Sequence, residues 1–347
     1  MKTLKNLAVG ACLALGLGGL GAVSASAQEA ASLANSHLLS AGINLNATDS
    51  AGHWAHIMPT VDIAKRMAAA LPPGPTLLLN HGGPIMPSIE IYNIFWVGAL
   101  RGGGTATLTA HYETVADDFA TDYAGHSIDS ILTQYNQTSP SNTIHGLSTA
   151  GAGGSYAGSY IDTDAFPASG CTDSRTPKDC ITDAQLRTEI TKVMAAKGWT
   201  GGLNKIYLVY TGSGQGSCFD ATSSSCAYTD YCAYHSSIGS GSTAVIYGNE
   251  PYAVPNACQG GTSPTGDPAA DAAVSVASHE TSEATTDPFG TTWWDSSGNE
   301  IGDKCAWNYG TNSYDSAKAN QEWNLRYYEL QMEFNNHTDS CTQAGPN

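Results

Sequence analysis

Charge is scarce in this sequence, and positive charge is the scarcer sign. Only 13% of the 347 residues are charged, and 14 Lys and Arg face 31 Asp and Glu, which gives a formal net charge of −17. Nucleic acids and anionic membrane surfaces are bound by basic patches, so neither is expected as a partner. Hydrophobic residues still make up 41% of the chain, with 17 Tyr and 7 Trp. This content excludes an acidic disordered chain and predicts a packed core.

Long hydrophobic runs are also missing, except at the N-terminus. Residues 7–23 form an apolar, glycine-rich run behind Lys2 and Lys5, and the small residues 25–27 (ASA) follow. This pattern is typical of a secretion signal with its cleavage site. We therefore expect residues 1–27 to be removed and the protein to be secreted, or periplasmic in a Gram-negative cell. No later stretch is long and apolar enough to span a bilayer, so no membrane contact is expected after signal removal.

Cysteine spacing of the CxxC type, which a cysteine metal cluster would need, is absent. Eight cysteines remain once the signal is removed, and all of them lie after residue 170. Because thiols oxidise outside the cell, an even number of cysteines in an exported chain predicts disulfides, here four, with the pairing left open. The eight are Cys171, Cys180, Cys218, Cys226, Cys232, Cys258, Cys305 and Cys341.

Proline and glycine mark a boundary before the main domain. Residues 28–75 are polar, contain no cysteine and end in the sequence LPPGP at 71–75, which must be extended or turning. We interpret residues 28–75 as an N-terminal arm, a linker or a removable pro-segment. Residues 76–347 are then a single domain.

Hydrophobic periodicity within this domain alternates between strand and helix patterns. Helices are expected where apolar residues recur every three or four positions, and strands where short β-branched and aromatic runs occur. Residues 146–170 are rich in glycine and serine and are expected to be a loop. The mixture predicts an α/β (α+β) fold with a mixed sheet, flanking helices and disulfide staples. The expected strands are 76–80, 88–97, 203–210 and 243–247, the expected helices are 112–135 with a break at Gly125, 183–197 and 268–284, and 325–334 is a last regular element.

The helix that begins after Asp267 carries the most informative motif. Asp267 is a good N-cap, Pro268 suits the first helical turn, and residues 269–284 contain neither glycine nor proline. Within this helix His279 and Glu283 stand four apart in the sequence HETSE, an HExxE motif. Residues four apart share one helix face, so both side chains can bind one ion, and Glu280 lies about 100° round the helix beside them. The alternative is a solvated helix face that carries these residues without a metal.

A second acidic segment follows at a useful distance. Asn299 and Glu300 come about twenty residues after His279, and Asp303 follows three residues later. The HExxE helix with this segment resembles the thermolysin-like zinc peptidases. Their motif is HExxH, with histidine at the last position, where this chain has Glu283. The resemblance implies that Glu300 is a third zinc ligand and that Asp303 orients His279. It also implies a zincin-like arrangement of the fold.

The chemistry expected from these residues is metal-assisted hydrolysis. Zinc held by His279, Glu283 and Glu300 would acidify a water, and Glu280 would accept its proton and pass it to the leaving amine. Tyr309 and His235 are the candidates for contacts to the oxyanion or the substrate. Calcium is the alternative ion, since acidic and amide residues recur between 287 and 303, although their spacing is not that of an EF-hand.

Several sequence blocks together resemble a known extracellular family. They run in order over most of residues 76–310, and the two late blocks contain the residues of the expected metal site. The chain resembles the EXORDIUM or phosphate-induced protein 1 family, whose plant members are associated with growth and cell expansion in the cell wall. The blocks are 81–84 (HGGP), 91–96 (IYNIFW), 206–209 (IYLV), 248–249 (GN), 258–260 (CQG), 274–280 (VSVASHE) with Glu283 and 286–288 (TDP), and 300–305 (EIGDKC) with 309–310 (YG).

Two functions follow from this reading. The first is a secreted zinc-dependent, metallopeptidase-like hydrolase that cleaves protein or peptide substrates. The second is a non-enzymatic extracellular protein, associated with a cell-wall polymer, whose metal only fixes the helix to the downstream loop. The first is the preferred hypothesis. Two carboxylate ligands would neutralise the charge of zinc and weaken it as a Lewis acid, so either nearby groups compensate or the site is slow or structural.

Overall fold

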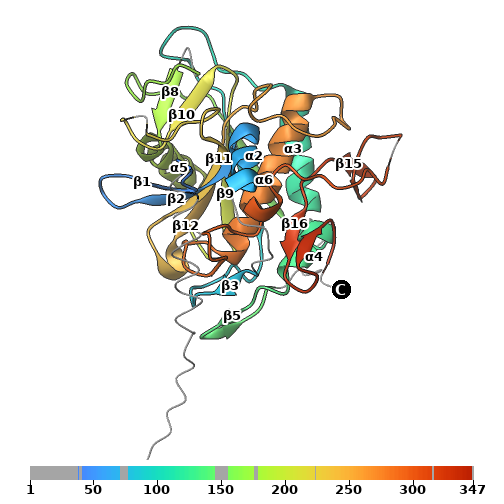
Figure 1. Cartoon of the computed structure of the whole chain (residues 1–347). Helices are drawn as coiled ribbons and strands as arrows, with labels where there is room; N and C mark the ends of the chain where they lie inside the picture. The colour runs from blue at the N-terminus through green and yellow to red at the C-terminus, as the bar shows by residue number, and fades with distance from the viewer. Residues whose placement is uncertain are drawn as a thin grey trace, which may run out of the picture.

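The structure is a computed structural model that describes residues 38, 41–70, 77–144, 155–175, 179–222, 224–314 and 316–345. The expected signal segment, residues 1–27, lies outside the described residues, as do residues 28–37 and 71–75 of the expected N-terminal arm. Within the described part, a seven-stranded sheet is packed between helices (Figure 1). The fold is therefore α/β with a mixed sheet, as the sequence predicts.

The sheet combines parallel and antiparallel pairing. Its order is β1-β2-β11-β12-β9-β4-β7. Strands β12, β9, β4 and β7 are parallel to one another, whereas β11 is antiparallel to both β12 and β2, and β1 is antiparallel to β2. The strands are β1 (Asn46–Thr48), β2 (Trp54–Pro59), β11 (Tyr231–Ile238), β12 (Val245–Glu250), β9 (Lys205–Thr211), β4 (Glu90–Trp96) and β7 (Tyr156–Asp162).

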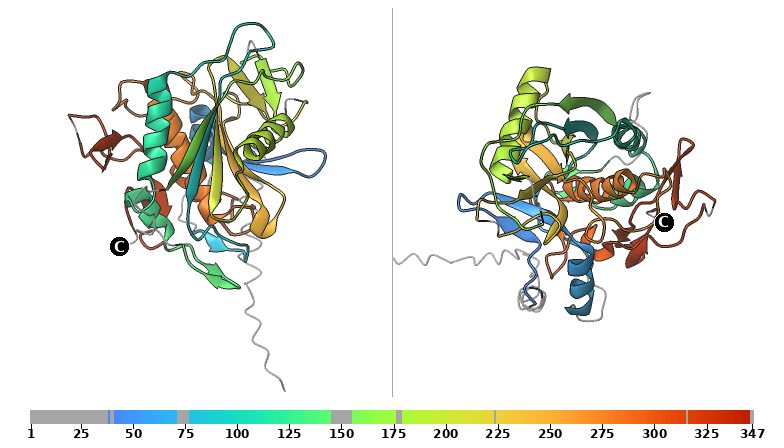
Figure 2. Two further views of the ribbon diagram at one scale, coloured as in Figure 1. Left: turned by 180° about the vertical axis from the view of Figure 1, so that it is seen from behind. Right: turned by 90° about the horizontal axis from the view of Figure 1, so that it is seen from above.

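Helices cover both faces of this sheet (Figure 2). On one face α3 (Ala110–Asp122), α4 (Ser127–Leu132) and α6 (Pro268–Thr286) share a hydrophobic cluster with inward residues of β4, β9 and β12. On the other face α5 (Asp183–Lys197) packs against the opposite side of the same strands. The N-terminal helix α2 (Val61–Ala70) follows β2 directly and buries Met67.

Local sequence signals account for the helix boundaries. Thr182 and Gln185 form a capping box at the start of α5, and Gly198 ends it in the left-handed conformation. The Asp267 side chain accepts hydrogen bonds from the first backbone N–H groups of α6. The helical segment expected at 112–135 is divided into α3 and α4, and Gly125, with φ of +84°, lies at the break. These predictions are confirmed.

Four strands of the sheet, β1, β2, β7 and β11, were not predicted from the sequence. Strand β7 lies inside the segment expected to be a loop, because YAGSYID has small residues that suit a sheet edge and give no strand pattern. Strand β11 lies between the cysteine-rich segment and β12, and its sequence YCAYHSSI is polar although it is almost fully buried. The described residues 41–70 also belong to the sheet and its helices, since they form β1, β2 and α2.

Disulfides join segments around the central sheet, and one of them starts from strand β11 of the sheet itself. Four pairs form among the eight cysteines, as predicted: Cys171–Cys180, Cys218–Cys226, Cys232–Cys258 and Cys305–Cys341. The remaining short elements are β3 (Leu79–Asn80), β5 (Gln137–Thr138), β6 (Ser141–Asn142), β8 (Asp179–Thr182), β10 (Gln215–Cys218), β13 (Trp293–Trp294), β14 (Gln321–Trp323), β15 (Arg326–Tyr328), β16 (Glu333–Asn335) and β17 (Ser340–Thr342), with 3-10 turns η1 (Gly241–Thr243) and η2 (Asp303–Cys305). The regular element expected at 325–334 is thus two short strands.

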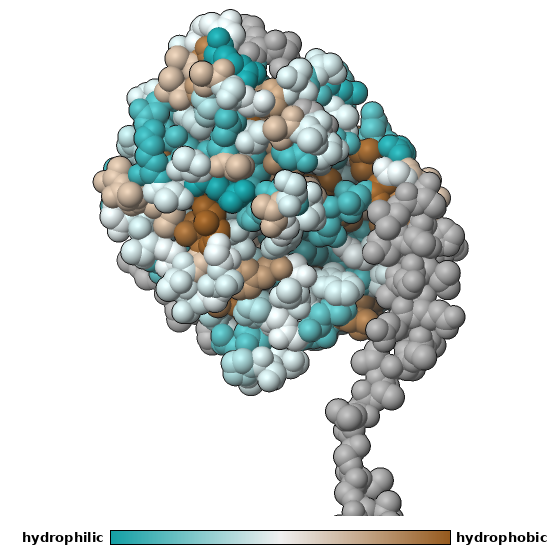
Figure 3. Space-filling model, turned by 90° about the vertical axis from the view of Figure 1, so that its left-hand side faces the viewer, coloured by the Kyte–Doolittle hydropathy of each residue, from teal (hydrophilic) through white to brown (hydrophobic). Residues whose placement is uncertain are grey.

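The surface carries little clustered apolar area on the face seen in Figure 3. That face is mostly hydrophilic to neutral, and its hydrophobic atoms fall into small separate groups. Among the helices of the described residues, none is long and apolar enough to cross a membrane.

Candidate metal centre

The HExxE motif lies on α6, and α6 is buried along its whole length. His279, Glu280 and Glu283 each have an exposed fraction of 0%. A solvated helix face is therefore excluded. Ionised side chains are almost never fully buried unless they are paired or bind a metal, so the charges of this helix need partners.

Two strands of the sheet bring histidines to the motif. His56 of β2 and His235 of β11 are directly opposite each other in the antiparallel ladder, and their ring centroids are 5.9 Å apart. Both rings are buried. His235 Nδ1 lies 3.1 Å from Glu280 Oε2 and 3.7 Å from Glu283 Oε2. The backbone N–H of Met58, also in β2, donates to Glu280 Oε1 at 3.2 Å.

The segment around η2 closes the group from the other side. Asp303 Oδ2 lies 2.7 Å from His56 Nε2 and accepts a hydrogen bond from the backbone N–H of Glu300. The Asp303 backbone N–H in turn donates to Glu283 Oε1 at 3.1 Å. The two carboxylate oxygens of Glu300 lie 3.4 Å from His56 Nδ1 and 3.8 Å from His235 Nε2. The Cys305–Cys341 disulfide ends this turn and fixes it to β17.

His279 is held by two sets of contacts. Its Nε2 lies 3.1 Å from Glu283 Oε1 and 4.0 Å from Asp303 Oδ1. Its Nδ1 lies 2.8 Å from the side-chain nitrogen of Gln331. Gly302 packs on the ring so closely that a Cβ atom there would lie 2.5 Å from Nδ1. Gln331, rather than Asp303, thus contacts the outer nitrogen of His279.

Crowding of buried carboxylates shifts the pKa values of this group. Burial raises the pKa of Glu280 and Glu300 well above the usual range, and nearby acids, first Glu283 for Glu280, raise it further. Burial lowers the pKa of His56, but Asp303 and Glu283 outweigh this effect and raise it to about 9. Burial lowers the pKa of His235 well below its usual range, and His56 adds to this. Positive charge placed among these buried acids would stabilise their ionised forms.

The residues present fit a divalent cation. The centre contains two groups of three residues whose ligand atoms all lie within 4.8 Å of one another inside each group. One is His56 with Glu283 and Asp303, and the other is His235 with Glu280 and Glu283. Glu283 Oε2, Glu300 Oε2 and Asp303 Oδ1 are buried and have no hydrogen-bond partner. Imidazole and carboxylate together suit zinc or a similar transition metal, whereas calcium takes six to eight oxygen ligands.

Asp287 and Asp295, two of the acidic residues considered for calcium, have hydrogen-bond or ion-pair partners within the chain. The Asp295 side chain accepts hydrogen bonds from the backbone N–H groups of Ser297 and Asn299, and it pairs with Lys304 at 3.0 Å. Asp287 likewise accepts from the backbone of the turn after α6. These contacts are those of turn-forming residues.

The centre contains the three motif residues, Glu300 of the second acidic segment, and one histidine, His56, that was not predicted from the sequence. His279, Glu280, Glu283 and Glu300 come together with Asp303 and with His235, which was considered only as an oxyanion or substrate contact. His56 was missed because it lies in the polar N-terminal segment. The apolar run around it, WAHIMP at 54–59, was the available strand signal.

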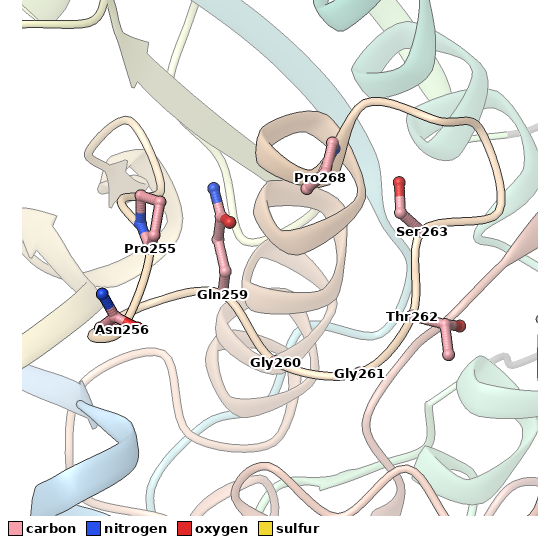
Figure 4. Close-up of a pocket in the computed structure, with 8 residues that line it drawn as sticks. All are labelled: Pro255, Asn256, Gln259, Gly260, Gly261, Thr262, Ser263 and Pro268. Atoms are coloured by element: carbon pink, nitrogen blue, oxygen red, sulfur yellow. The ribbon is translucent and has the colours of Figure 1, made fainter.

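The remaining candidate, Tyr309, lies beside Ser275, one turn of α6 before His279. It packs against Gly260 and Gly261, next to a cleft of about 350 Å³ beside the first turn of α6 (Figure 4). Because α6 rises 1.5 Å per residue, Pro268 at this cleft lies about 16 Å along the helix axis from His279. The cleft is lined by Pro255, Asn256, Gln259, Gly260, Gly261, Thr262, Ser263 and Pro268.

Comparison of the chain with protein-family models, with curated proteins and with solved structures gives no match in any of the three. The resemblances to the EXORDIUM family and to thermolysin-like peptidases therefore stay predictions.

Proposed function

We propose that this chain is a secreted, zinc-dependent hydrolase that cleaves peptide bonds of proteins or peptides outside the cell. The observation that carries the proposal is the complete burial of three imidazoles and four carboxylates around Glu283, with carboxylate oxygens that lack hydrogen-bond partners. Burial of so many acids without a cation would be very costly. The resemblances described above support the same class of reaction and an extracellular location.

Glu280 is the proposed proton carrier of the reaction. A bound zinc ion supplies Lewis-acid chemistry and makes water acidic enough to act as a nucleophile near neutral pH. Glu280 is oriented by the Met58 backbone through Oε1, while Oε2 is directed to His235. Burial raises the pKa of Glu280, so its carboxyl holds a proton more readily than that of an exposed glutamate. It would take a proton from water and give it to the leaving amine.

Two carboxylate ligands would weaken zinc as a Lewis acid, and the contacts of Glu283 reduce this effect in part. Glu283 Oε1 accepts from the Asp303 backbone N–H and lies within 3.1 Å of His279 Nε2. Each donor withdraws negative charge from the carboxylate, so Glu283 would neutralise a bound cation less than a free carboxylate does.

The second candidate function is a non-enzymatic extracellular protein with a structural metal, bound to a cell-wall polymer. The observation that favours it is closure of the centre, since none of its members is more than 5% exposed. Structural zinc sites are closed, whereas catalytic sites keep a position open. The two tryptophans considered for carbohydrate stacking already contact other rings of the chain. Trp293 packs on Tyr135, and Trp294 stacks on His81 with ring centroids 3.3 Å apart.

Metal analysis combined with a cleavage assay separates the two functions. Purified protein is analysed for bound metal and incubated with casein and a peptide library, alongside Glu280→Gln and the control Glu322→Gln on β14. The hydrolase predicts bound zinc and a loss of cleavage of at least about 100-fold in Glu280→Gln only. Bound zinc without Glu280-dependent cleavage would favour the structural function, and absence of any metal would refute both.

A further inference from the structure

We propose that the imidazole ligand of the cation is His56 of the N-terminal strand β2, acting with Glu283 and Asp303, and that His279 of the HExxE motif is a positioning residue for Glu283. This inference rests on the proposed function, since it presupposes a bound cation. It differs from the ligand set His279, Glu283 and Glu300 that the motif implies. Three observations carry it.

The first observation is the position of the ligand atoms. His56, Glu283 and Asp303 can each offer an atom within 4.8 Å of the other two. His56 Nε2 and Asp303 Oδ2 are 2.7 Å apart, a separation at which one ion can contact both. Asp303 Oδ1 and Glu283 Oε2 are fully buried without a hydrogen-bond partner, so this site still has unused acceptors. The site thus joins residues from three elements, β2, α6 and η2.

The second observation concerns the outer nitrogen of each ring. A histidine that binds a metal through one nitrogen donates the N–H of the other to an acceptor, which fixes its tautomer. His56 meets this requirement, because its Nδ1 lies 3.2 Å from the side-chain oxygen of Asn46 on the neighbouring strand β1. With the proton on Nδ1, the lone pair of Nε2 is directed at Asp303.

His279 does not meet the requirement, because its Nδ1 faces a donor. The Gln331 side-chain nitrogen lies 2.8 Å from Nδ1 and 3.0 Å from the Gly302 carbonyl, to which it must donate. The Gln331 oxygen accepts from the Trp307 backbone N–H, which fixes the orientation of the amide. Nδ1 is therefore the acceptor, and the neutral ring carries its proton on Nε2, directed at Glu283 Oε1. In this tautomer the protonated Nε2 faces Glu283 Oε1 at 3.1 Å, without a hydrogen bond of good geometry, and cannot bind a cation.

The third observation is that His235 is already engaged with Glu280. Its Nε2 donates to the Asp287 carbonyl at 3.3 Å, and its Nδ1 lies 3.1 Å from Glu280 Oε2. This hydrogen bond serves the proposed proton carrier, whereas His56 contacts Asp303, whose second oxygen, Oδ1, has no hydrogen-bond partner. His56 is thus the ring whose outer nitrogen has an acceptor, Asn46, and whose inner nitrogen lies at a carboxylate other than that of the proposed proton carrier.

A consequence follows for the N-terminal segment. His56 and its outer partner Asn46 form a cross-strand pair of the β1–β2 hairpin. Cation binding is then coupled to docking of this hairpin on β11. Removal of residues 28–75 as a pro-segment would remove both residues and abolish the site instead of activating it.

The test measures zinc affinity by competition with a chromophoric chelator, using the full chain and zinc alone. His56→Asn should lose more affinity than the roughly 10–100-fold that loss of an outer partner costs, while His279→Asn should lose no more than that amount. The exposed residue His337 provides the control, and His337→Asn should bind zinc as the wild type does. Wild-type affinity in His56→Asn, or a larger loss in His279→Asn than in His56→Asn, would overturn the inference.

A second measurement avoids variants that fail to fold. Long-range proton–nitrogen NMR spectra of wild-type protein labelled with ¹⁵N-histidine are recorded with and without zinc. The inference predicts that zinc shifts Nε2 of His56 most and leaves its Nδ1 protonated, and a largest shift at His279 would refute it. If zinc binds and supports cleavage but its ligand is His279, only this inference fails. If no zinc binds, the proposed function fails with it.

Discussion

Replacement of Glu283 by glutamine changes charge at the centre of the buried group while it preserves shape. Glu283 is 0% exposed, and its Oε1 accepts a hydrogen bond that the glutamine oxygen can still accept. The effect on stability should have opposite signs with and without a cation. With a cation bound, the variant loses a ligand; without one, it loses repulsion among neighbouring acids.

The magnitude follows from linkage between binding and folding. Zinc at about 100 times its dissociation constant stabilises the folded protein by about 2.7 kcal/mol. In domains of 150–250 residues, 1 kcal/mol shifts the melting temperature by about 2–4 °C. Chelation should therefore lower the melting temperature of the wild type by roughly 5–10 °C. Glu283→Gln should lose most of this dependence on zinc.

Without zinc the order of stabilities should reverse. Glu280, Glu300, Asp303 and Glu333 are all buried close to Glu283. Neutralising Glu283 removes repulsion from this group, so the variant in EDTA should be at least as stable as the wild type in EDTA.

Thermal unfolding of wild type, Glu283→Gln and the control Glu322→Gln, each with zinc and with EDTA, is the assay. The control should follow the wild type in both conditions. The reasoning is refuted if EDTA leaves the wild-type melting temperature unchanged, or if Glu283→Gln in zinc is as stable as the wild type in zinc.

Three further predictions address the supports of the centre and a separate acidic group. Gly302→Ala places a methyl group 2.5 Å from His279 Nδ1, although its φ of −78° suits alanine, and should cost about 1–3 kcal/mol of unfolding free energy in urea denaturation. Loss of the Cys305–Cys341 bond, which spans 36 residues, should cost about 4 kcal/mol and weaken zinc binding, measured on the double serine variant. Burial raises the pKa of Asp162 to about 7, so the folded protein should lose stability as the pH rises from about 4 to about 7, a loss that Asp162→Asn should remove in denaturation at several pH values.

Each of these three predictions has a contrary outcome. Wild-type stability of Gly302→Ala would mean that the His279 ring is not confined by the backbone. Unchanged zinc binding in the serine variant would mean that η2 is held in place without the disulfide. An equal gain of stability at pH 5 and pH 8 in Asp162→Asn would show that the Asp162 carboxyl does not titrate near 7.

Local signals in the sequence were sufficient for the helices and for part of the sheet. The cap at Asp267 and the uninterrupted run behind it predicted α6, and Thr182 with Gly198 predicted α5. Capping residues act within one helical turn, so they can be recognised without knowledge of the fold. Strands β7 and β11 were not recognised, because small or polar residues filled them and their strand pairing depends on neighbours distant in sequence.

Only part of the candidate centre could be predicted from the sequence, again because strand pairing brings together residues that are distant in sequence. Helical spacing brings His279 and Glu283 to one face of α6, so that half follows from local geometry. His56 reaches the centre through pairing of β2 with β11, over a separation of about 180 residues that no spacing rule covers. The sequence also does not show that α6 is buried. Its burial results from packing of the sheet and the surrounding segments around it.

The most direct test of the account is anomalous scattering from crystals of the purified protein grown with zinc, recorded at the zinc absorption edge. The account predicts one peak within about 2.0–2.2 Å of carboxylate oxygens of Glu283 and Asp303 and of an imidazole nitrogen. Absence of a peak at Glu283, with the carboxylates of the centre still buried, would contradict the claim that these residues hold a cation.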